Sequence, residues 1–342
     1  MFLTFNSTGA DDAWLKAVEL FREPNVPSNL SSRAGETIEQ LHVGLSVSSP
    51  EQRWVISRNP PLNPAFALAE IVWILNGRND SPFLNYFNSR LPEYAGHTPT
   101  YPGSYGFRLR HHFGIDQLSS AYQSLRSNPS TRQVVLQIWD SKTDFPGASG
   151  APSSADVPCN VVSILKVREG KLEWLQVMRS NDLMLGLPYN LVQFTTLQEV
   201  LAGWLGVKVG TYNHISDSLH VYCSQIEWLK GAKPIESKQN TDVLALPKEE
   251  SEAAFGKLSN VGNEIIDSRT GWKDLRSIVK RSELPVGFQN MLRVMSAEGA
   301  RKRKHTELSE EIMSECTNPI FRQLWARWAS RSSTPVQQLS IN

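Results

Sequence analysis

Cys159 is the residue whose type and position first suggest chemistry. It lies between Pro158 and Asn160, at the start of the alternating apolar run VVSILKV (161–167). Single cysteines in such surroundings are most often small, inert core residues. A cysteine becomes a nucleophile when nearby cations or hydrogen-bond donors stabilise its thiolate. Arg179, one predicted hairpin away on the neighbouring strand, has the spacing to do this, so both interpretations stay open.

Glu70 is the second candidate because its neighbours along the chain are apolar. The segment NPAFALAEIVWILNG (63–77) has almost no other polar residue before Asn76. A carboxyl group buried there would have a raised pKa and could transfer protons near neutral pH. The alternative is a glutamate on a narrow polar stripe that faces solvent, and the segment alone favours neither.

The block MRSNDLMLGLPYN (178–190) gathers polar side chains between a predicted strand and a predicted helix. Arg179 offers planar, bidentate donors that suit a phosphate or a carboxylate. Asn190 carries an amide donor and an amide acceptor, which can read the edge of a pyrimidine. Considered alone, the block also fits an ordinary loop, and His220 and Tyr222 in SDSLHVY fit structural roles. The candidates within the block are Arg179, Ser180, Asp182 and Asn190.

Two buried helices are expected to position these residues. In the segment 63–77, Asn63 can cap the helix, Pro64 suits its first position and Gly77 suits a left-handed exit. Its apolar residues cover nearly the whole circumference, so this helix should be buried on all sides. The segment 190–206 repeats apolar residues at helical spacing and ends on a glycine, which predicts a core-facing helix.

Strands are expected to carry the cysteine and the arginine. RQVVLQIWD (132–140) predicts one strand, and 161–178 predicts two strands joined by a turn that contains glycine. Between them lies KTDFPGASGAPSSADVP (142–158), which is rich in Pro, Gly, Ser and Ala. A loop of that length in a compact domain indicates a functional or mobile segment.

The composition and patterning of the residues change after about residue 232. A polar stretch is followed by charged and apolar residues that alternate in helical fashion. We therefore expect an α/β body over 1–234 and a mostly helical C-terminal extension over 235–342, packed on the body. The basic run RKRKH (301–305) is better explained as a helix end or loop in solvent than as a phosphate or nucleic-acid patch.

Composition narrows the class of function. The chain has 342 residues, of which 40% are hydrophobic, enough for a substantial core. Its 35 basic and 34 acidic residues leave a net charge of +1, which does not favour binding of long nucleic acid. Three distant cysteines without CxxC spacing argue against a disulfide framework or a metal site. Without a recognisable leader or an apolar run of about 20 residues, we expect a cytoplasmic protein with no membrane span.

Taken together, these segments resemble thymidylate synthase and its sister pyrimidine-nucleotide hydroxymethylases. The block R-S-x-D-x-x-L-G-x-P-x-N after a P-C pair is a specific signature, and the match covers roughly the first two thirds of the chain in the correct order. The resemblance implies an α+β fold, with a large mixed sheet flanked by helices as the catalytic domain. The matching segments are SRAGET (32–37), AEIVWILNG (69–77), SYGFR (104–108), STRQVVLQIW (130–139), VPCN (157–160), MRSNDLMLGLPYN (178–190) and SDSLHVY (216–222).

The resemblance also implies a chemistry. The Cys159 thiolate would add to C6 of a pyrimidine nucleoside monophosphate, and C5 would then attack the one-carbon unit of 5,10-methylenetetrahydrofolate. Glu70 would organise water and proton transfers at the base. Arg132 matches an arginine that the family lends across a dimer interface, which implies a homodimer. Of the other residues, Arg33, Arg132, Arg179 and Ser180 would contact the phosphate, Asn190 the base, His220 and Tyr222 the sugar hydroxyl, and Asp182 the folate pterin, while Tyr105 would join the hydrogen-bond network around the nucleophile.

Departures from the family pattern bear on the product. Asn160 stands where thymidylate synthases usually have a histidine, and Gln133 stands where a second phosphate arginine is usual. The stretch between Gly77 and Tyr105 lacks the tryptophan that shields the methylene intermediate from water, and the tail QQLSIN is not an apolar closing segment. A less shielded intermediate favours capture by water, so we expect hydroxymethylation.

Two other functions stay open at this point. One is thymidylate synthase proper, which reductively methylates dUMP to dTMP. The other is a catalytically silent homologue that only binds nucleotides. Cys159 and Glu70 argue against silence, because binding alone needs neither residue. Asn190 favours a uridylate over a cytidylate, since the family pairs Asn at this position with uracil.

Overall fold

The computed structural model describes residues 2–22, 30–32 and 35–331. Within this part of the chain, eight strands form one mixed sheet in the order β1-β3-β8-β6-β5-β4, with β2 paired to β3 and β7 paired to β8. The pairs β1/β3, β6/β8 and β7/β8 are parallel and the others are antiparallel. The strands are β1 (Leu3–Ser7), β2 (Leu30–Ser32), β3 (Gly35–Val47), β4 (Val135–Gln137), β5 (Asn160–Arg168), β6 (Lys171–Met178), β7 (Asn181–Asp182) and β8 (Lys208–Tyr222).

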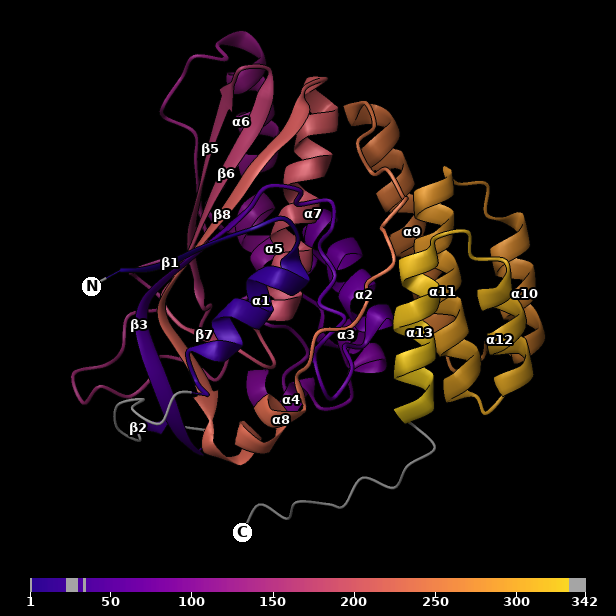
Figure 1. The fold of residues 1–342 in the computed structure, drawn as a ribbon. Coiled ribbons are helices and arrows are strands. Elements are labelled where there is room, and N and C mark those ends of the chain that lie inside the picture. Colours follow the sequence, from indigo (N-terminus) through magenta and orange to yellow (C-terminus); the bar gives the residue numbers. More distant parts are fainter. Residues whose placement is uncertain (1, 23–29, 33–34, 332–342) are drawn as a thin grey trace.

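Helices cover one face of the sheet, and the C-terminal helices form an outer layer beyond them (Figure 1). The helices of the first layer are α1 (Ala10–Glu19), α2 (Pro64–Leu75), α3 (Ser81–Phe87), α4 (Leu91–Ala95), α5 (Tyr105–Phe107), α6 (Gln117–Ser127), α7 (Leu187–Leu205) and α8 (Ile226–Gly231), with the short turns η1 (Arg108–His112) and η2 (Cys223–Gln225). The later helices are α9 (Lys248–Ile266), α10 (Trp272–Arg281), α11 (Val286–Lys302), α12 (Thr306–Ser314) and α13 (Pro319–Arg331). The expected α+β fold is confirmed.

The two faces of the sheet differ in burial, as the alternation in β6 shows. Trp174 and Met178 point toward α7 and are 1% and 0% exposed. Leu175 and Val177 point to the opposite face and are only partly buried. No described helix covers that opposite face (Figure 1).

Helix α2 forms where local signals predict it. The Asn63 side chain accepts a hydrogen bond from the backbone N–H of Phe66 at 3.1 Å, Pro64 is the first helical residue, and Gly77 has a φ of +65°. Every residue of the helix except Glu70 is buried. Because α7 packs on one side of α2 and α9, α11 and α13 pack on others, the helix has no solvent face.

The other predicted elements are found with shifted ends. Helix α7 starts at Leu187, three residues before the expected start, and ends at Leu205, followed by Gly206 with a φ of +66°. The hairpin β5–β6 turns at Glu169 and Gly170, both with positive φ. The strand expected over 132–140 is reduced to β4, which spans three residues.

The C-terminal helices pack on the body through α2. The irregular stretch 233–247 leads into α9. Asn76, at the end of α2, donates through Nδ2 to the carbonyl oxygen of Phe255 in α9 at 3.0 Å, and Arg78 donates to the Ser259 hydroxyl at 2.9 Å. No helix in the described part of the chain is both long and apolar enough to span a membrane.

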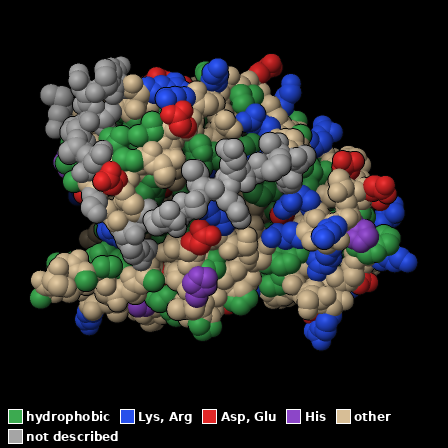
Figure 2. Space-filling view, turned by 90° about the horizontal axis from the view of Figure 1, so that it is seen from below, with side chains coloured by type: hydrophobic (Ala, Val, Ile, Leu, Met, Phe, Trp, Pro, Cys, Tyr) green, Lys and Arg blue, Asp and Glu red, His purple; other side chains and the backbone are tan. Residues whose placement is uncertain are grey.

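The basic run 301–305 is partly structural. Arg303 donates to the carbonyl oxygens of Ile265 and Asp267, each at 2.9 Å, at the end of α9. Arg301 forms an ion pair at 2.7 Å with Glu298, a carboxylate that is 0% exposed. Lys and Arg side chains gather over the C-terminal helices on the face seen in Figure 2. Arg303 therefore ties the end of α11 to the end of α9, whereas the Arg301 ion pair lies within α11.

Candidate active site

Cys159 and Arg179 lie at directly paired positions where the β5–β6 hairpin meets the loops. Cys159 is half-buried and immediately precedes β5, and Arg179 immediately follows β6. The backbone N–H of Arg179 donates to the carbonyl oxygen of Cys159 at 2.9 Å. The hairpin thus brings the thiol and the arginine together, in the arrangement that their spacing predicts.

The guanidinium of Arg179 is turned toward the segment that carries the cysteine. Nε donates to the carbonyl oxygen of Pro158 at 3.0 Å, and Nη2 donates to that of Val157 at 3.3 Å. Its central carbon lies 5.3 Å from the centroid of the Trp139 ring. A positive charge held in this place favours the thiolate form of Cys159.

Tyr105, at the start of α5, lies where the candidate groups converge. Burial raises the pKa of its phenol well above the usual value. Negative charge at Cys159 and at Glu70 raises this pKa further, and the positive charge of Arg179 lowers it. All three groups are therefore close enough to act on one hydroxyl, although they come from distant parts of the chain.

Glu70 is the only residue of α2 that is not apolar. Burial raises the pKa of its carboxyl group to about 8, and a side-chain hydrogen bond with Gln193 opposes this rise. The Oε2 atom is buried and has no hydrogen-bond partner within the described residues. A carboxyl group that titrates near neutral pH and keeps an oxygen available has the properties of a general acid or base. These properties favour the functional interpretation over the solvent-facing stripe.

Asn190, in the first turn of α7, is held by a residue that the sequence did not single out. Its Nδ2 donates to Oε1 of Gln193 at 3.1 Å, and the two residues are 6% and 5% exposed. Gln193 in turn hydrogen-bonds with Glu70. The spacing of three residues on a predicted helix was the available signal, because it places both amides on one face.

Asn160 lies in a buried network of amides beside the cysteine. It is 0% exposed, its Oδ1 accepts a hydrogen bond from Nε2 of Gln176, and its Nδ2 has no partner within the described residues. Gln176 also accepts a hydrogen bond from Ser163 at 2.7 Å. Asn160, which stands where thymidylate synthases usually have a histidine, is thus hydrogen-bonded by an amide on the neighbouring strand.

Asp182, His220 and Tyr222 lie together at the end of the sheet. Asp182 of β7 pairs with His220 of β8 in the strand register, and the rings of His220 and Tyr222 are 5.6 Å apart. Asp182 Oδ1 accepts hydrogen bonds from the backbone N–H groups of Met184 and Leu185, both at 2.7 Å. Burial raises the pKa of Asp182.

The remaining candidates are not brought into this cluster. Ser180 is half-buried between the candidate arginine and β7. Arg132 is exposed just before β4, with no side-chain hydrogen bond or ion pair to another described residue, and Gln133 is exposed beside it. Arg33 and the tail 337–342 lie outside the described residues.

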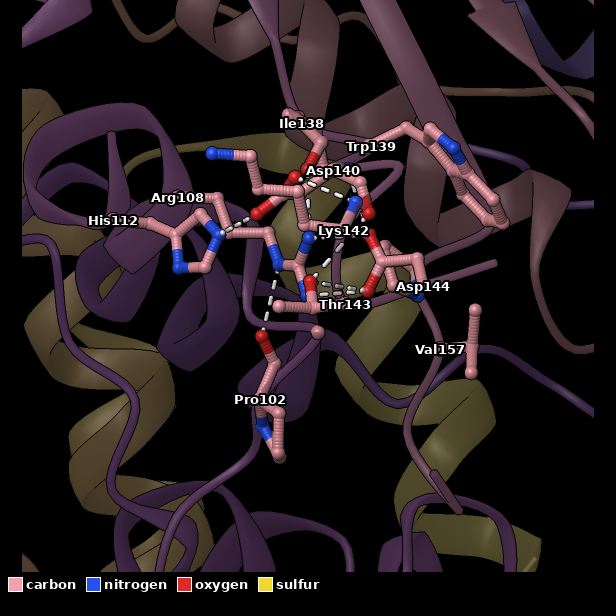
Figure 3. Close-up of polar contacts among 12 residues, drawn as sticks. Pro102, Arg108, His112, Ile138, Trp139, Asp140, Lys142, Thr143, Asp144 and Val157 are labelled. Carbon is pink, nitrogen blue, oxygen red and sulfur yellow. Dashed lines mark hydrogen bonds and ion pairs between the residues drawn. The ribbon is translucent and has the colours of Figure 1, made fainter. Parts of the chain in front are cut away.

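The long loop before Cys159 is anchored by a buried ion pair that the sequence did not reveal. Arg108 of η1 is 2% exposed and Asp144 is 4% exposed, and they form two hydrogen bonds, at 2.5 and 2.8 Å (Figure 3). Arg108 also donates to the carbonyl oxygens of Pro102 and Ile138, both at 2.9 Å. Neither residue type nor spacing predicts a pair between positions 36 residues apart, so this ion pair could be found only in the structure.

A second contact ties the start of the same loop. The His112 Nε2 and Asp140 Oδ2 atoms lie 2.8 Å apart, and the Asp140 backbone N–H donates to the Asp144 carboxylate at 2.8 Å. Figure 3 shows this cluster next to Trp139 and Val157, which both contact the candidate arginine. The loop therefore begins and ends at fixed points beside the cysteine.

Comparison with known proteins agrees with this arrangement. The family model for thymidylate synthase matches residues 53–255, which is more than half of the chain. Deoxyuridylate hydroxymethyltransferase of Bacillus phage SP01 is 34% identical over 229 residues, 64% of this chain and 58% of that protein. The protein of the same name from Pseudomonas phage M6 is 37% identical over 175 residues, 51% of this chain and 48% of that one.

A thymidylate synthase of Clostridium beijerinckii is 28% identical over 184 residues, 53% of this chain and 65% of that protein. The chain thus spans about half the length of the phage relatives that it matches. The matched region contains Cys159, Glu70 and Arg179, which the hairpin and α2 bring to one place. The chain belongs to the thymidylate synthase family.

Proposed function

We propose that this protein is a transferase that attaches a one-carbon unit to C5 of a pyrimidine nucleoside monophosphate, with dUMP as the favoured substrate. The observation that carries the proposal is the pairing of Cys159 with Arg179 at the end of the β5–β6 hairpin, with Glu70 on α2 close enough to act on the same tyrosine, Tyr105. This set combines a thiol beside a cation with a carboxyl group that titrates near neutral pH.

In the proposed reaction, the Cys159 sulfur forms a bond to C6 of the base and the C5–C6 π electrons move toward C5 and O4. C5 is then nucleophilic and attacks the one-carbon unit, whose bonds to the nitrogens of the donor break as tetrahydrofolate leaves, and water supplies the hydroxyl oxygen of the product. Loss of the C5 proton and of the sulfur–C6 bond restores the unsaturated ring. Glu70 handles the protons of this sequence through ordered water, and Arg179 stabilises the thiolate and contacts the phosphate.

The one-carbon donor is proposed to be 5,10-methylenetetrahydrofolate, which supplies a carbon at the oxidation level of formaldehyde. The donor set around Asp182 fits this molecule. Its Oδ1 is occupied by two backbone N–H groups, which leaves Oδ2 to accept from the N–H donors of a pterin ring.

For the product, we propose hydroxymethylation. The two phage relatives carry that activity in their names. In the stretch between Gly77 and Tyr105, which has no tryptophan, the Phe83 and Phe87 rings are 0% and 2% exposed. These two buried rings do not replace the tryptophan as a shield, which favours capture of the exocyclic methylene carbon by water.

Phosphate binding is proposed to use Arg179 and Ser180 of one subunit with Arg33, and Arg132 of a second copy of the chain. A homodimer is supported by the uncovered face of the sheet. Val162, Val177 and Ile215 are neighbours across three strands on that face, where they form an apolar row. His220 and Tyr222 are proposed to hold the sugar hydroxyl.

We also propose the division into a catalytic domain over 1–234 and a helical extension over 235–342. The location proposed for the protein is the cytoplasm. The irregular stretch before α9 supports the division, while the family match extends into that helix, to residue 255.

Release of tritium from C5 tests the proposed reaction. The protein is incubated with C5-tritiated dUMP, dCMP, UMP or CMP, with and without methylenetetrahydrofolate, and the nucleotide product is identified by mass spectrometry. Tritium release with dUMP and a product heavier by a hydroxymethyl group are expected. A purely methylated product would sink the hydroxymethyl proposal, and binding without tritium release from any nucleotide would favour the silent homologue.

A further inference from the structure

Gln193 occupies a connecting position between two proposed functional residues. It lies on α7, is 5% exposed, and has its Oε1 bound by Asn190 Nδ2 at 3.1 Å. Its side chain also hydrogen-bonds with Glu70, which projects from α2, the helix packed against α7. We propose that Gln193 is a positioning residue that fixes which way the Asn190 amide faces the base, and that it thereby selects uracil over cytosine. This inference rests on the proposed function.

The direction of each amide follows from hydrogen-bond chemistry. Because Oε1 of Gln193 accepts the hydrogen bond from Asn190, the NH2 group of Gln193 is the end that faces Glu70, and a carboxyl group keeps an oxygen that accepts whether or not it is protonated. The Gln193 carbonyl faces Asn190. Asn190 therefore donates from its own NH2 group, as the contact from Nδ2 to Oε1 shows. The reversed Asn190 amide would place two carbonyl oxygens against each other in a buried site, which is costly.

The fixed amide matches one base. Uracil presents a keto acceptor at position 4 and an N–H donor at position 3, whereas cytosine presents an amino donor and a bare acceptor. Position 4 adjoins C5, the carbon whose protons Glu70 handles, so the end of the Asn190 amide nearer Glu70 faces position 4. That end is Nδ2, because it points toward Gln193. An N–H group there pairs with the keto oxygen of uracil and opposes the amino group of cytosine.

Gln193→Met tests this role, because methionine keeps the length of the side chain without its hydrogen bonds. We expect the ratio of kcat/KM for dUMP over dCMP to fall at least about tenfold, since the loss of one hydrogen bond releases the amide. The value of kcat/KM should fall for dUMP alone, whereas a merely structural effect would lower kcat/KM for dUMP and for dCMP together. Dissociation constants of dUMP and dCMP, measured by calorimetry, should change in the same direction.

Gln198→Met is the matched control. Gln198 is a 0% exposed glutamine of the same helix, and it donates to the carbonyl oxygen of Leu172 at 2.8 Å, on the sheet side. Its loss should lower the melting temperature without changing the ratio between the two bases. If Gln193→Met does not fold, Gln193→Asn keeps the amide but is one methylene too short to reach both partners, and the same fall is expected.

The outcomes of these experiments distinguish failure of the Gln193 role from failure of the proposed function. Turnover of dUMP by the unmodified protein, with an unchanged base ratio in both Gln193 variants, would overturn the role of Gln193 and leave the proposed function standing. No turnover of any nucleotide by the unmodified protein would overturn both. A fall of the ratio in the Gln193 variants and not in Gln198→Met supports the inference.

Discussion

The backbone N–H of Arg179 donates to the carbonyl oxygen of Cys159 at 2.9 Å, so the hairpin itself holds the two residues that carry the cation and the thiol at paired positions. The arginine does not depend on a mobile loop to reach the cysteine. Its side chain adds two contacts to the carbonyl oxygens just before that cysteine. The thiol is therefore expected to be activated before substrate arrives.

Cys159→Ala should abolish release of tritium from C5 of dUMP and leave dUMP binding within a few-fold, because the side chain forms the bond to C6 but contributes little to binding. Cys316→Ala is the control. Burial raises the pKa of that thiol to about 11, so it stays protonated, and the variant should retain turnover. Substantial turnover by Cys159→Ala would refute the nucleophilic role.

Arg179→Met should slow alkylation of Cys159 by iodoacetamide at pH 7 by about tenfold, because the thiolate loses the neighbouring positive charge. The matched control is Arg168→Met, which removes another arginine bound to a backbone carbonyl, that of Val167, at the far end of the hairpin. Mass spectrometry of the modified peptide gives both rates. Equal rates in the two variants would mean that the arginine does not activate the cysteine.

Glu70→Gln should change how stability depends on pH. The folded pKa of Glu70, about 8, is above the ordinary 4.5, so the folded chain keeps a proton that the unfolded chain has already lost. Stability of the unmodified protein should therefore fall as pH rises from about 5 to 9, by a few kcal/mol. The variant lacks this carboxyl group and should show a flatter profile in urea unfolding. The same variant should lose on the order of a hundredfold in kcat.

Asp144→Asn should destabilise the protein by about 3–5 kcal/mol, because it leaves the Arg108 guanidinium buried without its carboxylate. Asp140→Asn weakens only a partly exposed contact with His112 and should cost less than about 1 kcal/mol. Urea unfolding measures both changes. Limited proteolysis should cut the segment 145–156 faster in Asp144→Asn, and equal cleavage in the two variants would show that the ion pair does not anchor the loop.

Arg132 and Cys159 offer a test of the homodimer by complementation. If Arg132 acts in the partner's site, Arg132→Glu and Cys159→Ala should each be inactive alone. Subunit exchange between them should rebuild one complete site in each mixed dimer, and random exchange restores about a quarter of all sites. Activity that stays at the level of the separate variants after exchange would place Arg132 outside the shared site.

Sequence reasoning reached those features that depend on local signals. The capping residue Asn63 and the exit at Gly77 define α2 to within a residue or two, and a carboxyl group with a raised pKa was one of the two interpretations that the apolar neighbours of Glu70 left open. The hairpin that joins Cys159 to Arg179 was also predictable, because alternation and a glycine turn fix the pairing.

The contacts that escaped prediction join distant positions or depend on amide geometry. Arg108 and Asp144 look like ordinary surface residues until the fold buries them together. The short β4 is explained similarly, since only three of the nine residues predicted as a strand pair with β5. Gln193 carried no charge to attract attention, and its two partners sit on different helices.

Helix α2 has consequences for any attempt to make a smaller version of this protein. It lies between α7 and the helices α9, α11 and α13, and every side chain but Glu70 is buried. A version trimmed at residue 234 would expose a wall of apolar side chains on the reverse of the helix that carries the proposed proton-transfer group. Such a fragment would aggregate unless the exposed apolar side chains were replaced by polar ones. The outer helices therefore cannot be removed without redesigning α2.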